Sequence, residues 1–83
     1  MDEYFGLQKD GIYRHFKGNH YVIIGFGRDT ETDKIMVIYR RHDLPGSQVW
    51  IRSAAMFAET VNRDGKEFAR FQQIGICPQS HFI

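Results

Sequence analysis

Disulfide bonds cannot hold this chain together, because its 83 residues include a single cysteine, Cys77. A lone thiol suits a reducing compartment, and we expect the protein to be cytoplasmic. The acidic start, Met1-Asp2-Glu3, lacks the positive charge of a secretory signal. No apolar run approaches the ~20 residues that a membrane-spanning helix needs, so no membrane partner is expected.

Neither sign of charge is in clear excess. Eleven Lys and Arg side chains stand against ten Asp and Glu, a net charge of +1, whereas a general nucleic-acid binder carries a strong positive excess. The distribution is less even than the total, since residues 9–28 hold four basic side chains and one acidic side chain, Asp10. The sequence therefore allows a local basic patch.

A chain of this length builds one hydrophobic core and leaves little room for a deep substrate cavity. Seven Phe, four Tyr and one Trp supply most of the large apolar surface. Each such ring buries roughly 150 to 250 Å². We predict one domain at residues 11–71, with an N-terminal extension at residues 1–10 and a C-terminal tail at residues 72–83.

Four segments have the composition of short β-strands, with β-branched and aromatic residues bounded by turn residues. They are residues 12–16, 21–26, 35–40 and 48–52. Gly18-Asn19 favours a tight turn between the first two, and Gly25 favours a bulge in the second. The apolar run at 35–40 predicts burial on both strand faces. Alternation in 48–52 places Trp50 and Arg52 on the same face.

A short helix is expected after the fourth strand. Ser53 is a good N-cap, and the alanine-rich residues 54–59 have high helix propensity. One or two helical turns fit there, and we expect Met56 and Phe57 to point toward the core.

Asp64-Gly65 is a favoured tight-turn pair, so residues 60–62 and 67–71 form a last hairpin or lead into a fifth strand. Short strands, frequent turn residues and one helical segment favour a strongly bent barrel over a sandwich. We predict a mainly β fold, a small SH3-like antiparallel barrel of about five strands with one short helical turn. An α+β roll is the alternative if the helix is longer.

The order of motifs resembles that of a family of small bacterial proteins. The motifs are G-x-Y-R-H-F-K-G at residues 11–18, Glu31-Thr32, Val37-Ile38-Tyr39, Trp50-Ile51-Arg52, Met56-Phe57, Asp64-Gly65-Lys66 and Arg70-Phe71. This pattern is similar to that of the domain-of-unknown-function family DUF1653, and it covers about residues 11–71. The resemblance implies an SH3-like barrel and brings no activity, cofactor or partner. The chain departs from the family pattern at Ser53, where proline is usual, and at Ala55, close to where an acidic residue is usual.

Basic and aromatic side chains recur at short intervals in the expected strands, which favours a binding surface over a catalytic pocket. The candidate binding residues are Tyr13, Arg14, His15, Lys17, Tyr39, Trp50, Arg52 and Arg70. Trp50, Arg52 and Arg70 combine a stacking plane with guanidinium groups. Sites for single-stranded nucleic acid or acidic peptides use that combination.

Each candidate also has a structural interpretation. The sole Trp of a small barrel more often packs in the core, and polar strand residues often bond the fold's own carboxylates and carbonyls. Alternation places Tyr13 and His15 on the strand face opposite Arg14. Nearby positive charge on Arg14 and Lys17 should keep His15 neutral at pH 7.

The sequence carries no cofactor or metal signature. The four histidines, His15, His20, His42 and His81, show no i, i+4 spacing and no neighbouring cysteine pair, so we predict no metal site. Cys77 is interpreted as a small apolar side chain of the tail. Glu31, Glu59 and Asp64 have no spacing that fixes an acid–base pair, so no catalytic residue is predicted and an enzyme is not the favoured interpretation.

Three functions agree with these features. The first and main prediction is a binding module whose aromatic and basic surface contacts nucleic acid or an extended protein segment. The second is a small enzyme or metabolite-binding protein with His15 and a carboxylate such as Glu31 at the barrel mouth. The third is a structural subunit that acts by association through an edge strand or the tail. Whether Trp50 is buried, or open beside Arg52 and Tyr39, distinguishes the first from a purely structural interpretation.

Overall fold

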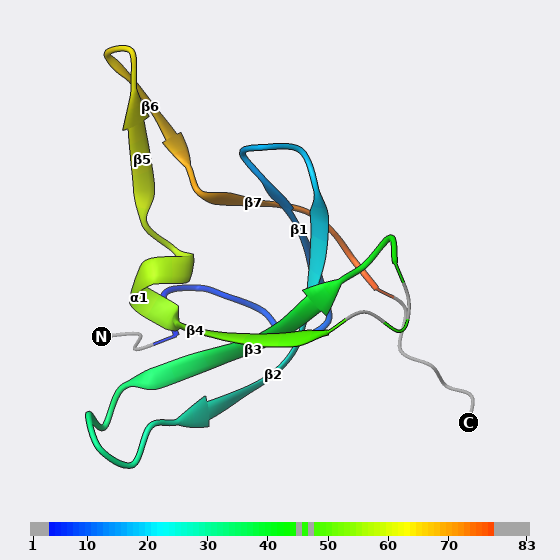
Figure 1. Cartoon of the computed structure of the whole chain (residues 1–83), viewed down its shortest axis with the longest axis vertical. Helices are drawn as coiled ribbons and strands as arrows, with labels where there is room; N and C mark the ends of the chain where they lie inside the picture. The colour runs from blue at the N-terminus through cyan, green and yellow to red at the C-terminus, as the bar shows by residue number, and fades with distance from the viewer. Residues whose placement is uncertain (1–3, 45, 47, 78–83) are drawn as a thin grey trace.

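A five-stranded antiparallel sheet forms the body of the protein in the computed structural model, which describes residues 4–44, 46 and 48–77. The elements are β1 (Gly11–His15), β2 (His20–Arg28), β3 (Ile35–Arg41), β4 (Val49–Ser53), α1 (Ala54–Phe57), β5 (Thr60–Arg63), β6 (Lys66–Ala69) and β7 (Phe71–Ile76). The sheet has the strand order β4-β3-β2-β1-β7, and β5 and β6 pair as a separate hairpin (Figure 1).

The prediction of a mainly β fold is confirmed, with seven strands among the described residues in place of about five. The sheet is not a closed barrel, because its outer strands β4 and β7 do not pair with each other. The helix has four residues, so the fold is not the α+β roll. No helix in the described part of the chain has the length and apolar character needed to cross a membrane.

Turn residues determine where the chain bends. The register of β2 against β3 shifts between Ile23 and Gly25, which confirms the bulge predicted at Gly25. Asp64 and Gly65 both adopt positive φ, 53° and 76°, between β5 and β6. Positive φ at both central residues is characteristic of the tightest hairpin turns, and it explains why this pair joins the two strands.

The hydrophobic core lies between α1 and one face of the sheet. Ser53 caps the helix as predicted, since its hydroxyl accepts a hydrogen bond of 3.2 Å from the backbone N–H of Met56. Phe57 is fully buried and stacks on Phe71 of β7, with ring centroids 3.9 Å apart. Met56, also predicted to face the core, is 48% exposed. A single helical turn directs only one of two adjacent side chains toward the sheet.

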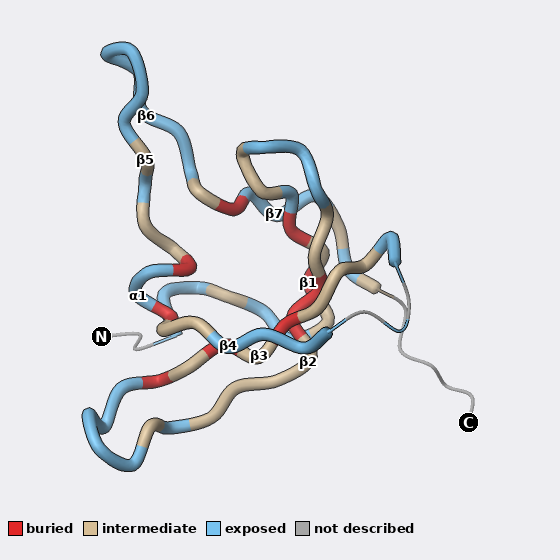
Figure 2. Tube along the Cα trace, in the orientation of Figure 1, coloured by how far each residue is buried: buried red, intermediate tan, exposed pale blue. Residues whose placement is uncertain are grey.

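Burial alternates along β3, as Figure 2 shows for the trace. Ile35, Val37 and Tyr39 are buried, while the residues between them are only half-buried. The prediction of burial on both faces of this strand is therefore wrong. The buried cluster around Phe57 covers only one face of the sheet.

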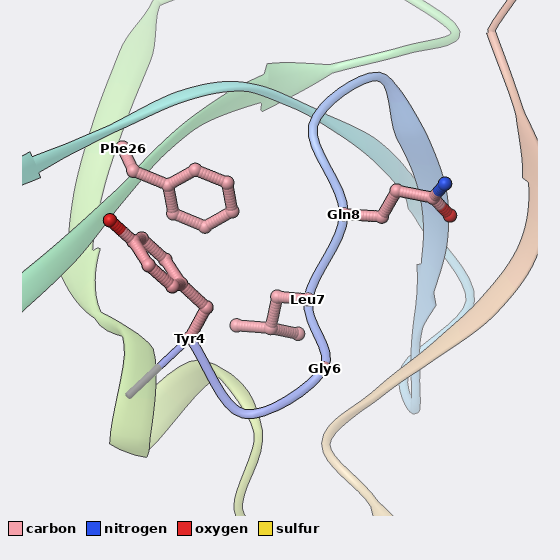
Figure 3. A pocket seen from close by; sticks show the side chains of 5 residues that line it. All are labelled: Tyr4, Gly6, Leu7, Gln8 and Phe26. Atoms are coloured by element: carbon pink, nitrogen blue, oxygen red, sulfur yellow. The ribbon is translucent and has the colours of Figure 1, made fainter. Parts of the chain in front are cut away.

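The N-terminal residues 4–8 pack beside β2 (Figure 3). The Tyr4 ring meets the Phe26 ring edge-on at a centroid distance of 5.0 Å, and Leu7 packs against the core. The backbone N–H of Gln8 donates a hydrogen bond of 3.0 Å to the Tyr13 hydroxyl. Near the other end of the described chain, β7 continues the sheet through residues 72–76, which belong to the segment predicted as a C-terminal tail.

Candidate binding cleft

An open cleft of about 430 Å³ lies on the core-bearing face of the sheet. It is located where the outer strands β4 and β7, which do not pair with each other, come near one another. Its lining residues are His15, Tyr21, Tyr39, Trp50, Ile51, Arg52 and Phe71. They come from all five strands of the sheet. We call this site the seam cleft.

Strand register explains why these side chains meet. Tyr39 lies opposite Trp50 of β4, and His15 lies opposite Phe71 of β7. Directly opposite residues of antiparallel strands share a face of the sheet. The predicted alternation of β4 is confirmed, because Trp50 and Arg52 both contact Tyr39.

Trp50 is accessible in this cleft. The indole packs against the rings of Tyr21 and Tyr39, whose centroids lie 5.8 and 6.0 Å from its own. The residue nevertheless remains 37% exposed. The structural interpretation of Trp50 as a core residue does not hold, because β4 is an outer strand and no other strand in the described part of the chain pairs with its free edge. A fixed but exposed indole is what a stacking platform requires.

Arg52 is held in place and keeps hydrogen-bond donors available. Its Nε donates to the Tyr39 hydroxyl at 3.2 Å, and its guanidinium carbon lies 5.8 Å from the centroid of the Phe71 ring. Among the described residues Arg52 forms no ion pair, and no Asp or Glu lines the seam cleft. The Nη groups can therefore donate to an anion that enters the cleft.

His15 presents a neutral ring to the cleft. Its Nδ1 accepts a hydrogen bond of 3.1 Å from the backbone N–H of Lys17, so the neutral tautomer carries its proton on Nε2. Burial lowers the pKa of His15 below its ordinary value of 6.5, and the positive charges of Arg70, Arg52 and Lys17 lower it further. The ring is thus neutral at pH 7, as predicted, and offers one N–H donor.

Acidification should destabilise the protein through His15. The unfolded chain takes up this proton near pH 6.5, whereas the folded protein takes it up only at lower pH, so the stability falls as the pH drops through 6.5. We expect a lower urea midpoint at about pH 5.5 than at about pH 7, and a smaller difference in His15→Gln. The same change at His20, outside the cleft, is the control. A pH dependence as strong in His15→Gln as in the wild type would contradict this assignment.

The structure brings together four of the eight predicted binding residues, His15, Tyr39, Trp50 and Arg52. Tyr13, also predicted as a binding residue, lies in the core, where it is only 3% exposed and its ring centroid is 5.3 Å from that of Phe57. It shares a sheet face with His15 but lies deeper, where α1 packs on the sheet. Burial also raises the pKa of its hydroxyl.

The other three predicted residues lie outside the seam cleft. Arg70 has a structural contact, since its Nη2 donates to Glu59 Oε2 at 2.6 Å and thereby joins the two ends of the β5–β6 hairpin. Arg14 is exposed and lies opposite Gln72 in the register of β1 and β7. Lys17 follows β1 and contacts His15 through its backbone N–H.

Three lining residues were not among the predicted binding residues: Tyr21, Phe71 and Ile51, which lies between the predicted Trp50 and Arg52. Tyr21 had a usable signal, because the tight turn after β1 places it opposite Tyr13 in the hairpin. Phe71 had none, since it enters the cleft only through the pairing of β7 with β1, which are far apart in the sequence.

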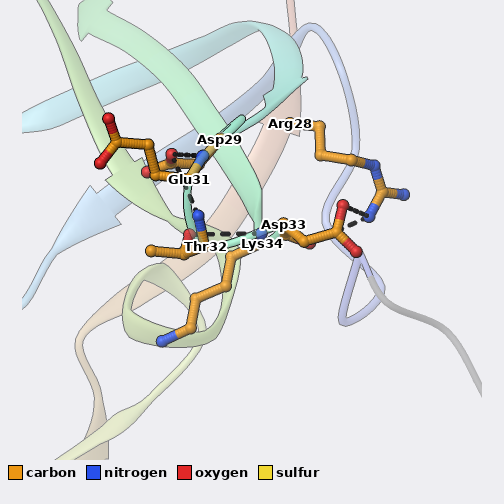
Figure 4. Close-up of polar contacts among 6 residues, drawn as sticks. All are labelled: Arg28, Asp29, Glu31, Thr32, Asp33 and Lys34. Carbon is orange, nitrogen blue, oxygen red and sulfur yellow. Dashed lines mark hydrogen bonds and ion pairs between the residues drawn. The ribbon is translucent and has the colours of Figure 1, made fainter.

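His15 and Glu31 do not share a site. Glu31 lies in the turn that follows β2, where Asp29 Oδ1 accepts a hydrogen bond of 2.8 Å from the Glu31 backbone N–H (Figure 4). His15 contacts Asn19, just before β2 begins. The strand between them spans roughly 26 Å at about 3.3 Å per residue, so the two side chains cannot act as an acid–base pair.

Metal binding finds no support in the described residues. No three His, Cys, Asp or Glu side chains gather there as a set of ligands. His81, the last of the four histidines, lies outside the described residues.

Similarity to known proteins extends over the whole seam cleft. A family model described as "Protein of unknown function (DUF1653)" matches residues 11–73, a range that includes every residue lining the seam cleft. The crystal structure of a DUF1653 protein from Bordetella bronchiseptica is similar, with a TM-score of 0.69 and 32% sequence identity. The match covers 88% of this chain and 95% of that chain. No curated protein matches.

Proposed function

Because the chain belongs to the DUF1653 family, as its motifs indicated, and that family has no assigned function, we propose a function from the cleft itself. The protein is a binding module that holds about one or two nucleotides of a single-stranded nucleic acid in the seam cleft. One observation carries the proposal: the exposed indole of Trp50 lies beside the Arg52 guanidinium, which has no ion pair and no neighbouring carboxylate in the cleft among the residues that the structure describes.

The cleft supplies three contacts that suit a nucleotide. A base stacks on the exposed part of Trp50, and a phosphate oxygen accepts hydrogen bonds from the Nη groups of Arg52. The Nε2–H of His15 provides a further donor. Tyr39 holds Arg52 in position before the ligand arrives, which reduces the entropy lost on binding.

A single strand fits these contacts better than a duplex. Stacking on Trp50 needs a base whose face is free, and the faces of paired bases are covered by their neighbours. The net charge of +1 also agrees with a short contact and not with binding along a long stretch of backbone. The proposal includes a cytoplasmic location, supported by the single cysteine.

Fluorescence of Trp50, the sole tryptophan, tests the proposal directly. We expect a short oligothymidylate to change the emission, with binding that weakens between about 50 and 200 mM salt. Arg52→Ala should weaken binding about fivefold or more and reduce the salt slope by about one. Arg28→Ala, at the end of β2 far from the cleft, should leave the affinity and the salt slope unchanged. The proposal is refuted if no salt-sensitive change occurs at low ionic strength.

An extended protein segment is the second candidate, and the free edge of β4 favours it. Val49 and Ile51 on this outer strand are 51% and 63% exposed, on either side of Trp50. A peptide strand that pairs with such an edge gains backbone hydrogen bonds, and acidic side chains would reach Arg52. Binding of an acidic peptide that changes the Trp50 emission, with no response to oligonucleotides, would establish this candidate in place of the first.

A further inference from the structure

We infer that the β5–β6 hairpin carries a second contact site for the same strand, so that bound nucleic acid runs from the seam cleft across the β1–β2 turn to the hairpin. This inference rests on the proposed function. It extends the site from about one or two nucleotides to about four.

One face of the hairpin is basic and aromatic. The hairpin projects away from the sheet and is largely exposed (Figures 1 and 2). Its register pairs Val61 with Phe68 and Arg63 with Lys66, so these four side chains share one face. Glu67, which pairs with Asn62, lies on the other face. The remaining acid of the hairpin, Asp64, is at its turn.

This basic face meets the β1–β2 turn. The rings of Phe68 and Phe16 are nearly parallel, at 11°, with centroids 6.3 Å apart. The Arg63 guanidinium lies 5.4 Å from the centroid of the Phe16 ring, and the Lys17 ammonium lies 5.9 Å from it. A cleft of about 330 Å³ opens beside them, which we call the hairpin cleft. It is lined by Arg14, Phe16, Phe68, Ala69 and Gln72.

The cations of this region are not neutralised by the fold. Within the described residues, ion pairs join Arg28 to Asp33, Arg41 to Asp43 and Arg70 to Glu59. None involves the four cations of the region, Arg14, Lys17, Arg63 and Lys66. The hairpin cleft therefore repeats the chemistry of the seam cleft, with accessible rings beside positive groups that have no carboxylate partner.

A row of aromatic rings connects the two clefts. Its centroid distances are 5.8 Å for Trp50–Tyr21, 6.3 Å for Tyr21–His15, 4.5 Å for His15–Phe16 and 6.3 Å for Phe16–Phe68. The row therefore has no break between β4 and the hairpin. Proteins that bind single strands without reading sequence combine such a series of rings with cations that follow the backbone. This continuity is why we assign both clefts to one ligand.

Oligonucleotide length separates the two sites. A dinucleotide can occupy the seam cleft alone, whereas a hexanucleotide reaches the hairpin. We expect Arg63→Gln/Lys66→Gln to leave dinucleotide affinity unchanged, to weaken hexanucleotide binding about tenfold, and to lower its salt slope by about two. Arg28→Gln/Lys34→Gln removes the same charge near the opposite end of β2 and should change neither affinity. Urea unfolding checks that both variants fold.

The outcomes distinguish the inference from the proposed function. Equal hexanucleotide affinity in Arg63→Gln/Lys66→Gln and the wild type, with the Trp50 response intact, would overturn the inference alone. An equal loss for both oligonucleotides would also overturn it, because the hairpin would then act on the seam cleft and not as a second site. Absence of any Trp50 response to either oligonucleotide would remove the proposed function together with the inference.

Discussion

Replacement of Phe57 by alanine should lower the free energy of unfolding by about 3 to 5 kcal/mol. The ring is fully buried and stacks on Phe71 at 3.9 Å. It also meets the rings of Tyr13 and Tyr39 edge-on, at centroid distances of 5.3 and 5.2 Å. Those three rings belong to three different strands of one sheet, so they cannot close together around the cavity that alanine leaves.

A loss of this size is a large part of the stability of a small domain, which is about 5 to 15 kcal/mol. Urea unfolding followed by Trp50 fluorescence measures it. Met56→Ala is the matched control, because the neighbouring side chain on the same helical turn is 48% exposed. It should change the stability by no more than about 0.5 kcal/mol. A loss below about 1 kcal/mol in Phe57→Ala would show that packing of α1 on the sheet contributes little to the stability of this core.

The same contacts connect the core to the seam cleft. Tyr39 and Phe71 pack on Phe57 with one part of their surface and line the cleft with another. Tyr39 in turn holds Arg52 through its hydroxyl. The position of the Arg52 guanidinium therefore depends on the Phe57 side chain, which does not line the cleft. This dependence explains how a four-residue helix on the core side supports a binding site at the edge of the sheet.

Features determined by local sequence were predicted well. Asp64-Gly65 joins a hairpin because few other residue pairs tolerate positive φ at both positions. Ser53 starts the helix because its hydroxyl replaces a missing backbone acceptor. The alternation in β4 placed Trp50 and Arg52 together because side chains of a strand repeat every second residue. None of these features needs information from a distant part of the chain.

The errors arise where the burial of a side chain, or the pairing of strands far apart in the sequence, decides the outcome. Alternation correctly put Tyr13 and His15 on one face, yet it could not show that α1 covers Tyr13 and leaves His15 at the rim. The sequence left open whether Trp50 lies in the core or at the surface, because it does not reveal that β4 is an outer strand. The pairing of β7 with β1 completes the cleft through Phe71. The mixed order of polar and apolar residues at 72–76 does not predict a strand, so nothing in the sequence indicated this pairing.

Replacement of Trp50 by alanine should weaken binding of a hexanucleotide about 5- to 150-fold, because stacking of one base contributes about 1 to 3 kcal/mol. Trp50→Phe keeps a ring and should lose less. The variants lack the sole tryptophan, so binding is measured by the fluorescence anisotropy of a labelled oligonucleotide. Val49→Ala is the control, because this residue is 51% exposed on the opposite face of the same strand.

A double-mutant cycle decides whether Trp50 and Arg52 hold the same nucleotide. If a base stacks on the indole while its phosphate bonds the guanidinium, loss of either contact loosens the other. The loss of affinity in Trp50→Ala/Arg52→Ala should then be smaller than the product of the two single losses. Strictly independent losses would place the two side chains on separate parts of the ligand. Unchanged affinity in Trp50→Ala would contradict the stacking platform, because the other rings of the seam cleft, those of His15, Tyr21, Tyr39 and Phe71, are buried or half-buried.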